Sequence, residues 1–159
     1  MLVDEVGLTL RAASVAASVF QVLGIPGALL VPLVLGRLRA QRGLALVVAT
    51  SWGLVPLGML LQPGLWAVWV GVGGLVQGAG VSLAFALVAV RGADEDAVGR
   101  LSAMTQLVGY SVGAAGPLVV GALLAAGGGW SGPFGLLVLV ATVYAAAGWV
   151  AGRPVQVGG

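Results

Sequence analysis

The chain has 159 residues, of which 60% are hydrophobic and 8% are charged, and its mean hydropathy is +1.12. A water-soluble domain carries about 25% charged residues, and disordered chains are rich in charge, so the composition excludes both classes. The formal net charge is +2. The basic residues lie in short breaks between apolar runs rather than on a solvated face, which argues against a nucleic-acid partner. We therefore expect an integral membrane protein whose partner is the lipid bilayer.

The sequence contains few residues that could act in catalysis or bind a cofactor. It contains no cysteine and no histidine, and its five acidic residues all lie near the N-terminus or between apolar runs. A hydrolase that acts within the membrane needs a general base or metal ligands near the bilayer plane. We therefore expect no enzymatic activity, no metal and no cofactor.

Three long stretches carry no charged residue, namely 12–36, 43–90 and 101–152. About 20 residues of helix cross a hydrocarbon layer of roughly 30 Å, so the first stretch holds one span and each of the others holds two. Glycine and proline clusters at 62–64 and 127–133 mark the turns that divide the long stretches. We expect one all-α transmembrane domain over 1–159. It is a polytopic bundle of five transmembrane helices near 12–36, 43–61, 65–90, 101–126 and 133–152.

The arginines predict the orientation of these spans. Cytoplasmic loops of membrane proteins carry an excess of basic residues. Six of the seven arginines follow the first, third and fifth spans, which end on one side of the membrane: Arg37, Arg39, Arg42, Arg91, Arg100 and Arg153. We therefore expect that side to be cytoplasmic in a cell membrane, with the N-terminus outside and the C-terminus inside.

The first and fourth spans resemble each other at a fixed offset of 85 residues. The matches that apolar composition alone does not explain are Gln21 with Gln106, Gly24 with Gly109, Pro32 with Pro117, and Gly36 with Gly121. These two spans cross the membrane in opposite directions, which is typical of the inverted-topology repeats in secondary transporters. Two repeats of three spans each would make six spans. The five spans would then lack the first helix of the first repeat.

Glycine pairs with a spacing of four residues occur in the third, fourth and fifth spans, as Gly74 and Gly78, as Gly109 and Gly113, and as Gly148 and Gly152. This spacing of small residues lets membrane helices approach each other closely. These glycines are therefore candidate points of contact with a neighbouring helix.

Several segments together resemble the C-terminal half of a major facilitator superfamily transporter, in the branch that includes cyanate and 2-nitroimidazole carriers. The resemblance is carried by residues 20–27, 101–110 and 113–118 and by the Gly-Trp-x-x-Pro turn at 129–133. It implies that the five spans correspond to helices eight to twelve of a twelve-helix protein. The chain would then be a fragment of a secondary transporter that moves a small solute by alternating access.

This resemblance also implies a missing partner. Alternating access rocks one half of the protein against the other around a central site, so without an N-terminal half the chain is not expected to transport alone. The alternative is a small structural or accessory membrane protein that is complete at five spans.

No ionisable residue lies inside the five expected spans, so the candidate solute contacts are neutral. Gln21, Gln77, Gln106 and Tyr110 lie within the first, third and fourth spans, and the resemblance implies that these spans line the cavity. Gln106 and Tyr110 share one helix face because they are four residues apart. The alternative role is interhelical hydrogen bonding. Trp52, in the middle of the second span, is expected to face lipid.

The loop at 36–43 is similar to a cytoplasmic loop motif of the superfamily, in which Gly-x-Leu is followed by an acid and by basic residues. The resemblance implies a gating role for Arg37, Arg39 and Arg42. Ala40 stands where the acid is expected. The alternative is an ordinary positive loop on the cytoplasmic side.

Overall fold

The structure is a computed structural model that describes residues 1–36 and 41–151. Within these ranges the chain forms five long helices and one short 3-10 helix. Their bounds are α1 (Leu10–Leu35), α2 (Gln41–Leu61), η1 (Pro63–Leu65), α3 (Trp66–Arg91), α4 (Glu95–Ala125) and α5 (Ser131–Ala151). All five long helices are long and apolar enough to cross a membrane. The expected all-α, multi-pass architecture is confirmed.

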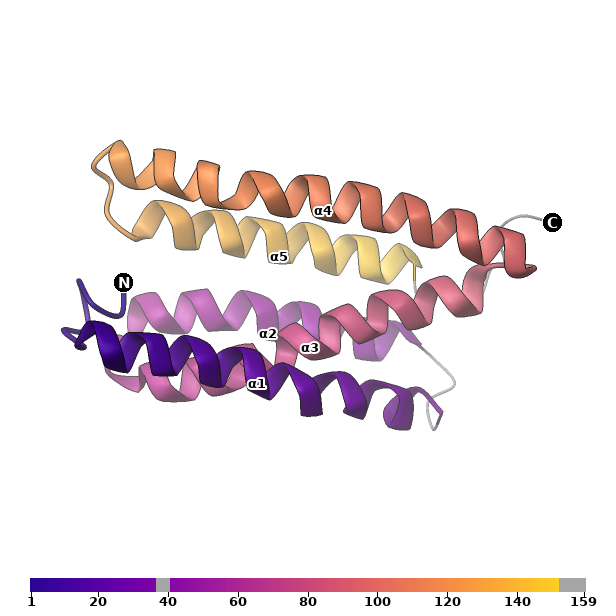
Figure 1. Cartoon of the computed structure of the whole chain (residues 1–159), viewed down its shortest axis with the longest axis horizontal. Coiled ribbons are helices and arrows are strands. Elements are labelled where there is room, and N and C mark those ends of the chain that lie inside the picture. The colour runs from indigo at the N-terminus through magenta and orange to yellow at the C-terminus, as the bar shows by residue number, and fades with distance from the viewer. Residues whose placement is uncertain (37–40, 152–159) are drawn as a thin grey trace.

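Consecutive helices run in alternating directions along the bundle (Figure 1). The start of α2, the end of α3, the start of α4 and the end of α5 all lie at one end, and the N-terminus lies at the other. The arginine-bearing connections described by the structure therefore share one end of the molecule. Helices α1 and α4 are antiparallel (Figure 1), as an inverted repeat requires.

Helix α4 begins at Glu95, six residues before the expected start of the fourth span at 101. Asp94 is its N-cap, and the Asp94 carboxylate accepts a hydrogen bond of 2.7 Å from the amide of Ala97. Glu95 and Asp96 follow in the first turn, where negative charge stabilises the positive end of the helix dipole. These three acids therefore form the N-terminus of α4.

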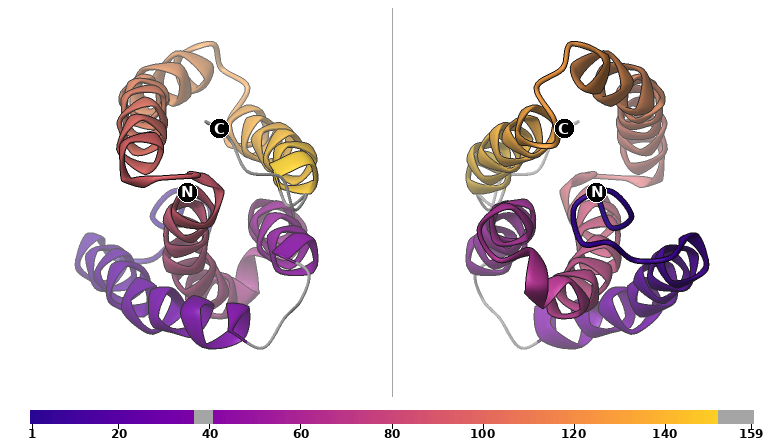
Figure 2. Two further views of the ribbon diagram at one scale, coloured as in Figure 1. Left: turned by 90° about the vertical axis from the view of Figure 1, so that its right-hand side faces the viewer. Right: turned by 90° about the vertical axis from the view of Figure 1, so that its left-hand side faces the viewer.

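The helices pack unequally. Helix α1 lies along α3, while α2 packs against both α5 and α3; α4 has much lighter contacts with α3 and α5. In the end-on views of Figure 2, α4 occupies the edge of the bundle. The most hydrophobic 18 residues of α4 include no buried residue, whereas one-third of the corresponding residues of α2 are buried. Helices α1, α2 and α3 are thus well packed against one another, whereas α4 is largely uncovered.

The core lies between α1, α2 and α3, where Val31, Val48 and Leu83 are almost completely buried. Trp52 packs against this core, so the expectation that Trp52 faces lipid is wrong. Its indole nitrogen lies 3.3 Å from the point where a Cβ on Gly80 would sit. Because Gly80 has no side chain, it leaves room for the indole of Trp52 to face inward.

Candidate functional site

A cavity of about 420 Å³ opens between α2, α3 and α5 and contains three side chains that can form hydrogen bonds. Trp52 comes from α2, Gln77 from α3 and Tyr144 from α5. An indole N–H donates only, an amide donates and accepts, and a phenol does both. The remaining lining is small or apolar, formed by Gly80, Val81, Ala84, Leu137, Val140 and Ala141. This mixture of an apolar wall and a few polar groups is typical of small-molecule sites.

The amide oxygen of Gln77 is the most unusual atom of this cavity. Gln77 is half-buried, and its Oε1 is shielded from solvent without a hydrogen-bond partner in the described part of the chain. Leaving a buried acceptor unpaired costs about 1–3 kcal/mol. A donor from a bound molecule or from another segment would recover that free energy. Gln77 was expected from the sequence to contact solute, and it is the one expected solute contact that lines this cavity.

The other three expected contacts lie elsewhere. Gln21 is exposed on α1, Gln106 is half-buried on α4, and Tyr110 is 72% exposed on the same helix. The cavity lining comes from α2, α3 and α5, so these three side chains do not join Gln77 there. A common solute surface for Gln21, Gln106 and Tyr110 stays a prediction.

Sequence reasoning missed Tyr144 and misplaced Trp52. The signal for Tyr144 was available, because it carries the one hydroxyl besides that of Thr142 in the apolar stretch 133–150. Nothing in the sequence distinguished a lipid-facing side chain from an inward-facing one in that stretch. The helix is apolar on all sides, so the period of the pattern does not reveal its buried face.

Arg42 at the start of α2 lies over the ring of Trp149 near the end of α5, with 5.1 Å from its guanidinium carbon to the ring centroid. This is a cation–π contact, and it joins two helices that also pack along their length. The Arg42 Nε is buried without a hydrogen-bond partner in the described residues. Arg37 and Arg39, the other two arginines expected to act in gating, lie outside the described residues.

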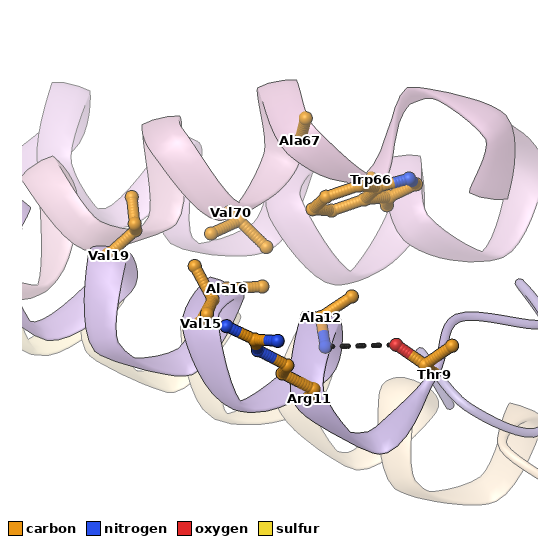
Figure 3. Close-up of a pocket in the computed structure, with 9 residues that line it drawn as sticks. All are labelled: Thr9, Arg11, Ala12, Val15, Ala16, Val19, Trp66, Ala67 and Val70. Carbon is orange, nitrogen blue, oxygen red and sulfur yellow. Dashed lines mark hydrogen bonds between the residues drawn. The ribbon is translucent and has the colours of Figure 1, made fainter.

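A second pocket, of about 510 Å³, lies between the N-terminal halves of α1 and α3 (Figure 3). Thr9 caps α1 there by accepting a hydrogen bond of 3.2 Å from the amide of Ala12. Arg11 and Trp66 also line this pocket, and otherwise the wall is formed by alanine and valine. Arginine and tryptophan near helix ends are typical of the membrane–water interface, so this pocket is suited to lipid rather than to a polar solute.

Comparison with known proteins shows what the chain is related to. It is 34% identical over 92% of its length to an uncharacterized transporter of Bacillus subtilis, and 32% identical over 83% of its length to the 2-nitroimidazole transporter of Escherichia coli. The matches cover 37% and 33% of those proteins, so the chain spans about a third of the length of these curated relatives. No family model matches the chain, and no solved structure matches it. The expected resemblance to part of a transporter is confirmed.

Proposed function

From the premise that this chain is a relative of major-facilitator-type transporters and matches part of one, we propose that it forms helices eight to twelve of a secondary transporter. The observation that carries the proposal is the 34% identity to a transporter over 92% of the chain. The transporter would move a small solute by alternating access, and it would need an N-terminal half as the partner that rocks against this one. The chain itself would not act as an enzyme.

The charges of the described helices favour a neutral solute. Every charged residue in them lies within two turns of a helix end: Arg11, Arg42, Arg91, Glu95, Asp96 and Arg100. The middle of each helix therefore offers no cation to pair with an anion. Amide and phenol groups suit a small heteroaromatic ring with polar substituents, and the relative named a 2-nitroimidazole transporter gives the first solute to try.

Gln21, Gln77, Gln106 and Tyr110 would supply the polar contacts to this solute. Gln21 and Gln106 occupy equivalent positions of the first and fourth spans, and Tyr110 lies one turn from Gln106 on the same face of α4. If α1 and α4 faced each other across the solute, the amides of Gln21 and Gln106 would lie on opposite sides of a flat ring. Gln77 would contact the solute from the cavity between α2, α3 and α5.

The orientation of the chain in the membrane follows from its arginines. The connections that share one end of the bundle would lie in the cytoplasm, together with the C-terminus, and the N-terminus would lie outside. Arg37 and Arg39 would contribute to this positive side, while Arg42 holds α2 to α5 through Trp149.

Binding of radiolabelled 2-nitroimidazole to the purified chain in lipid nanodiscs tests the solute proposal. We expect Gln21→Leu, Gln106→Leu and Tyr110→Phe each to weaken binding about 2- to 10-fold, because each change removes one hydrogen bond to the solute. The matched control is Gln62→Leu, an exposed glutamine at the turn between α2 and α3, which should bind as the unchanged chain does. No binding, or equal weakening by the control, would contradict the assignment.

A further inference from the structure

Three helices bring polar side chains together around Gly80 of α3. A Cβ on Gly80 would lie 3.3 Å from the indole nitrogen of Trp52 and 3.8 Å from the hydroxyl oxygen of Tyr144. Gln77 lies three residues earlier on α3, so it shares a helix face with Gly80, and it lines the same cavity of about 420 Å³. The amide, the indole and the phenol therefore border one shared space.

These three polar groups are not used by the rest of the described chain. The Oε1 of Gln77 is buried without a hydrogen-bond partner, and neither the Trp52 indole nor the Tyr144 hydroxyl forms a hydrogen bond with another described residue. Buried polar groups in proteins normally have a partner. The amide oxygen accepts, the indole N–H donates, and the hydroxyl can do either. A ligand that satisfies all three groups therefore carries both a donor and an acceptor.

The depth and the walls of the cavity restrict the ligand further. Trp52, Gln77 and Tyr144 lie near the middle of their helices, and the charged residues of the described helices all lie within two turns of a helix end. An ion without a partner at the middle of a bilayer is costly, so the ligand is uncharged. The indole and phenol rings and the apolar side chains of α5 favour a flat ring, because aromatic groups stack on one another.

We propose that this cavity selects uncharged azoles that carry an N–H group, with the Gln77 Oε1 accepting from the N–H and with Trp52 and Tyr144 donating to the acceptor side of the ring. The inference rests on the proposed function, in which Gln77 contacts the solute. It adds Trp52 and Tyr144 to that site, and it makes a donor on the ring the condition for binding. A site built to hydrogen-bond a ligand rejects an analogue that lacks the group, because its own polar atom then stays unpaired.

Benzimidazole and 1-methylbenzimidazole test the donor requirement. Both have the same flat ring system and the same acceptor nitrogen, but only benzimidazole has the N–H. Equilibrium dialysis against the purified chain in lipid nanodiscs, at a mildly alkaline pH at which both rings are uncharged, measures saturable binding. Empty nanodiscs measure the partition of each ring into lipid. We expect benzimidazole to bind the chain about tenfold more tightly than 1-methylbenzimidazole, because the methylated ring leaves the Gln77 oxygen unpaired.

Variants of the cavity then assign the contacts. Gln77→Leu should weaken the binding of benzimidazole about tenfold and leave that of 1-methylbenzimidazole unchanged, which isolates the direct contact as a double-mutant cycle does. Tyr144→Phe removes only a hydroxyl and should weaken both rings about 2- to 10-fold, since both carry the acceptor nitrogen. The matched control is Gln62→Leu at the exposed turn, which should change neither. A cooperative thermal unfolding transition in each variant shows that it folds.

Three results would overturn the inference. One is the absence of saturable benzimidazole binding by the folded, unchanged chain. Another is equal affinity for the two rings. The third is a preference for benzimidazole that survives in Gln77→Leu. The proposed function fails on different measurements, namely when 2-nitroimidazole does not bind or when changes at Gln21 and Gln106 leave its binding intact. The two benzimidazoles are compared without 2-nitroimidazole, so each assignment can fail separately.

Discussion

The contact at which glycines of α1 and α3 meet, which we call the α1–α3 crossing, and the equivalent stretch of α4 have related sequences but opposite surroundings. At the crossing, Gly24 lies against the backbone of Gly74 and Gly78, and a Cβ on Gly78 would have no room. On α4, Gly109 occupies the position equivalent to Gly24 at the offset of 85 residues, and a Cβ there would meet nothing within 4 Å. The same residue type is therefore a strict requirement in one place and unconstrained in the other. The difference shows that the glycine pattern predicts a helix neighbour without showing whether the chain itself supplies it.

The largest expected effect breaks the crossing. Gly78→Val should force α1 away from α3, because a side chain there would collide with the Gly24 backbone. Overpacking costs about 1–3 kcal/mol and occasionally more, so the midpoint of thermal unfolding in detergent should fall clearly. Gly71→Val in the same helix is the control, since a Cβ at Gly71 meets no atom within 4 Å. Equal loss in both variants would mean that the crossing is not the tight contact described.

Gln77→Leu tests the unpaired amide in the cavity between α2, α3 and α5. The change removes a buried acceptor that has no partner in the described residues, so the free energy of unfolding of the chain alone should rise by about 1 kcal/mol. Chemical unfolding in mixed micelles measures this value, and Gln62→Leu at the exposed turn should change it little. A clear loss of stability in Gln77→Leu would show that its amide is already paired.

Arg42→Ala tests a link between the two repeat units, because the contact with Trp149 joins α2 to α5. We expect a loss of about 0.5–2 kcal/mol in unfolding free energy. A double-mutant cycle with Trp149→Leu separates the cation–π contact from simple packing. Additive effects of the two changes would contradict a direct contact. Arg11→Ala, at an exposed position of α1, serves as the control for loss of charge.

The smallest effect concerns the N-terminal segment, which lies against the α4–α5 turn. Asp4 accepts hydrogen bonds from the N-terminal ammonium at 3.0 Å and from the Trp130 indole at 3.4 Å. The bond and the attraction from the ammonium, with a smaller part from Trp130, lower the pKa of Asp4 below its ordinary 3.8. A lowered carboxyl pKa stabilises the contact above the ordinary value, and the contact is lost as pH falls through the lowered one.

A variant that keeps Trp130 as its single tryptophan reports this contact by fluorescence. Its emission should stay constant from neutral pH down to about the ordinary carboxyl pKa of 3.8 and change only at lower pH. Asp4→Asn should abolish the pH dependence. A transition above 3.8 in the unchanged chain would contradict the lowered pKa.

Much of the fold could be predicted from the sequence because apolar length alone specifies a membrane helix. The glycine and proline clusters also divided the long stretches where the structure has turns. The start of α4 was expected six residues too late, at 101, although Asp94, Glu95 and Asp96 form its N-terminus. The expected start followed the uncharged stretch, which begins after Arg100.

The packing could not be predicted, and neither could much of the candidate site. Membrane helices such as α5 are apolar on all sides, so no stripe of residues marks the buried face. Trp52 and Tyr144 line one cavity with Gln77, although the period of the pattern marked neither side chain as facing inward. The glycine at Gly80 that admits Trp52 is likewise visible only once α2 and α3 are side by side.

Labelling of single cysteines from the two sides of the membrane tests the inverted repeat most directly. Gly36→Cys, Ala93→Cys and Gly128→Cys lie at exposed turns in a chain that has no other cysteine. In oriented vesicles, an impermeant maleimide should label positions 36 and 93 from the cytoplasmic side and position 128 from the opposite side. If positions 36 and 93 were labelled from different sides, α1 and α4 would not cross the membrane as antiparallel copies.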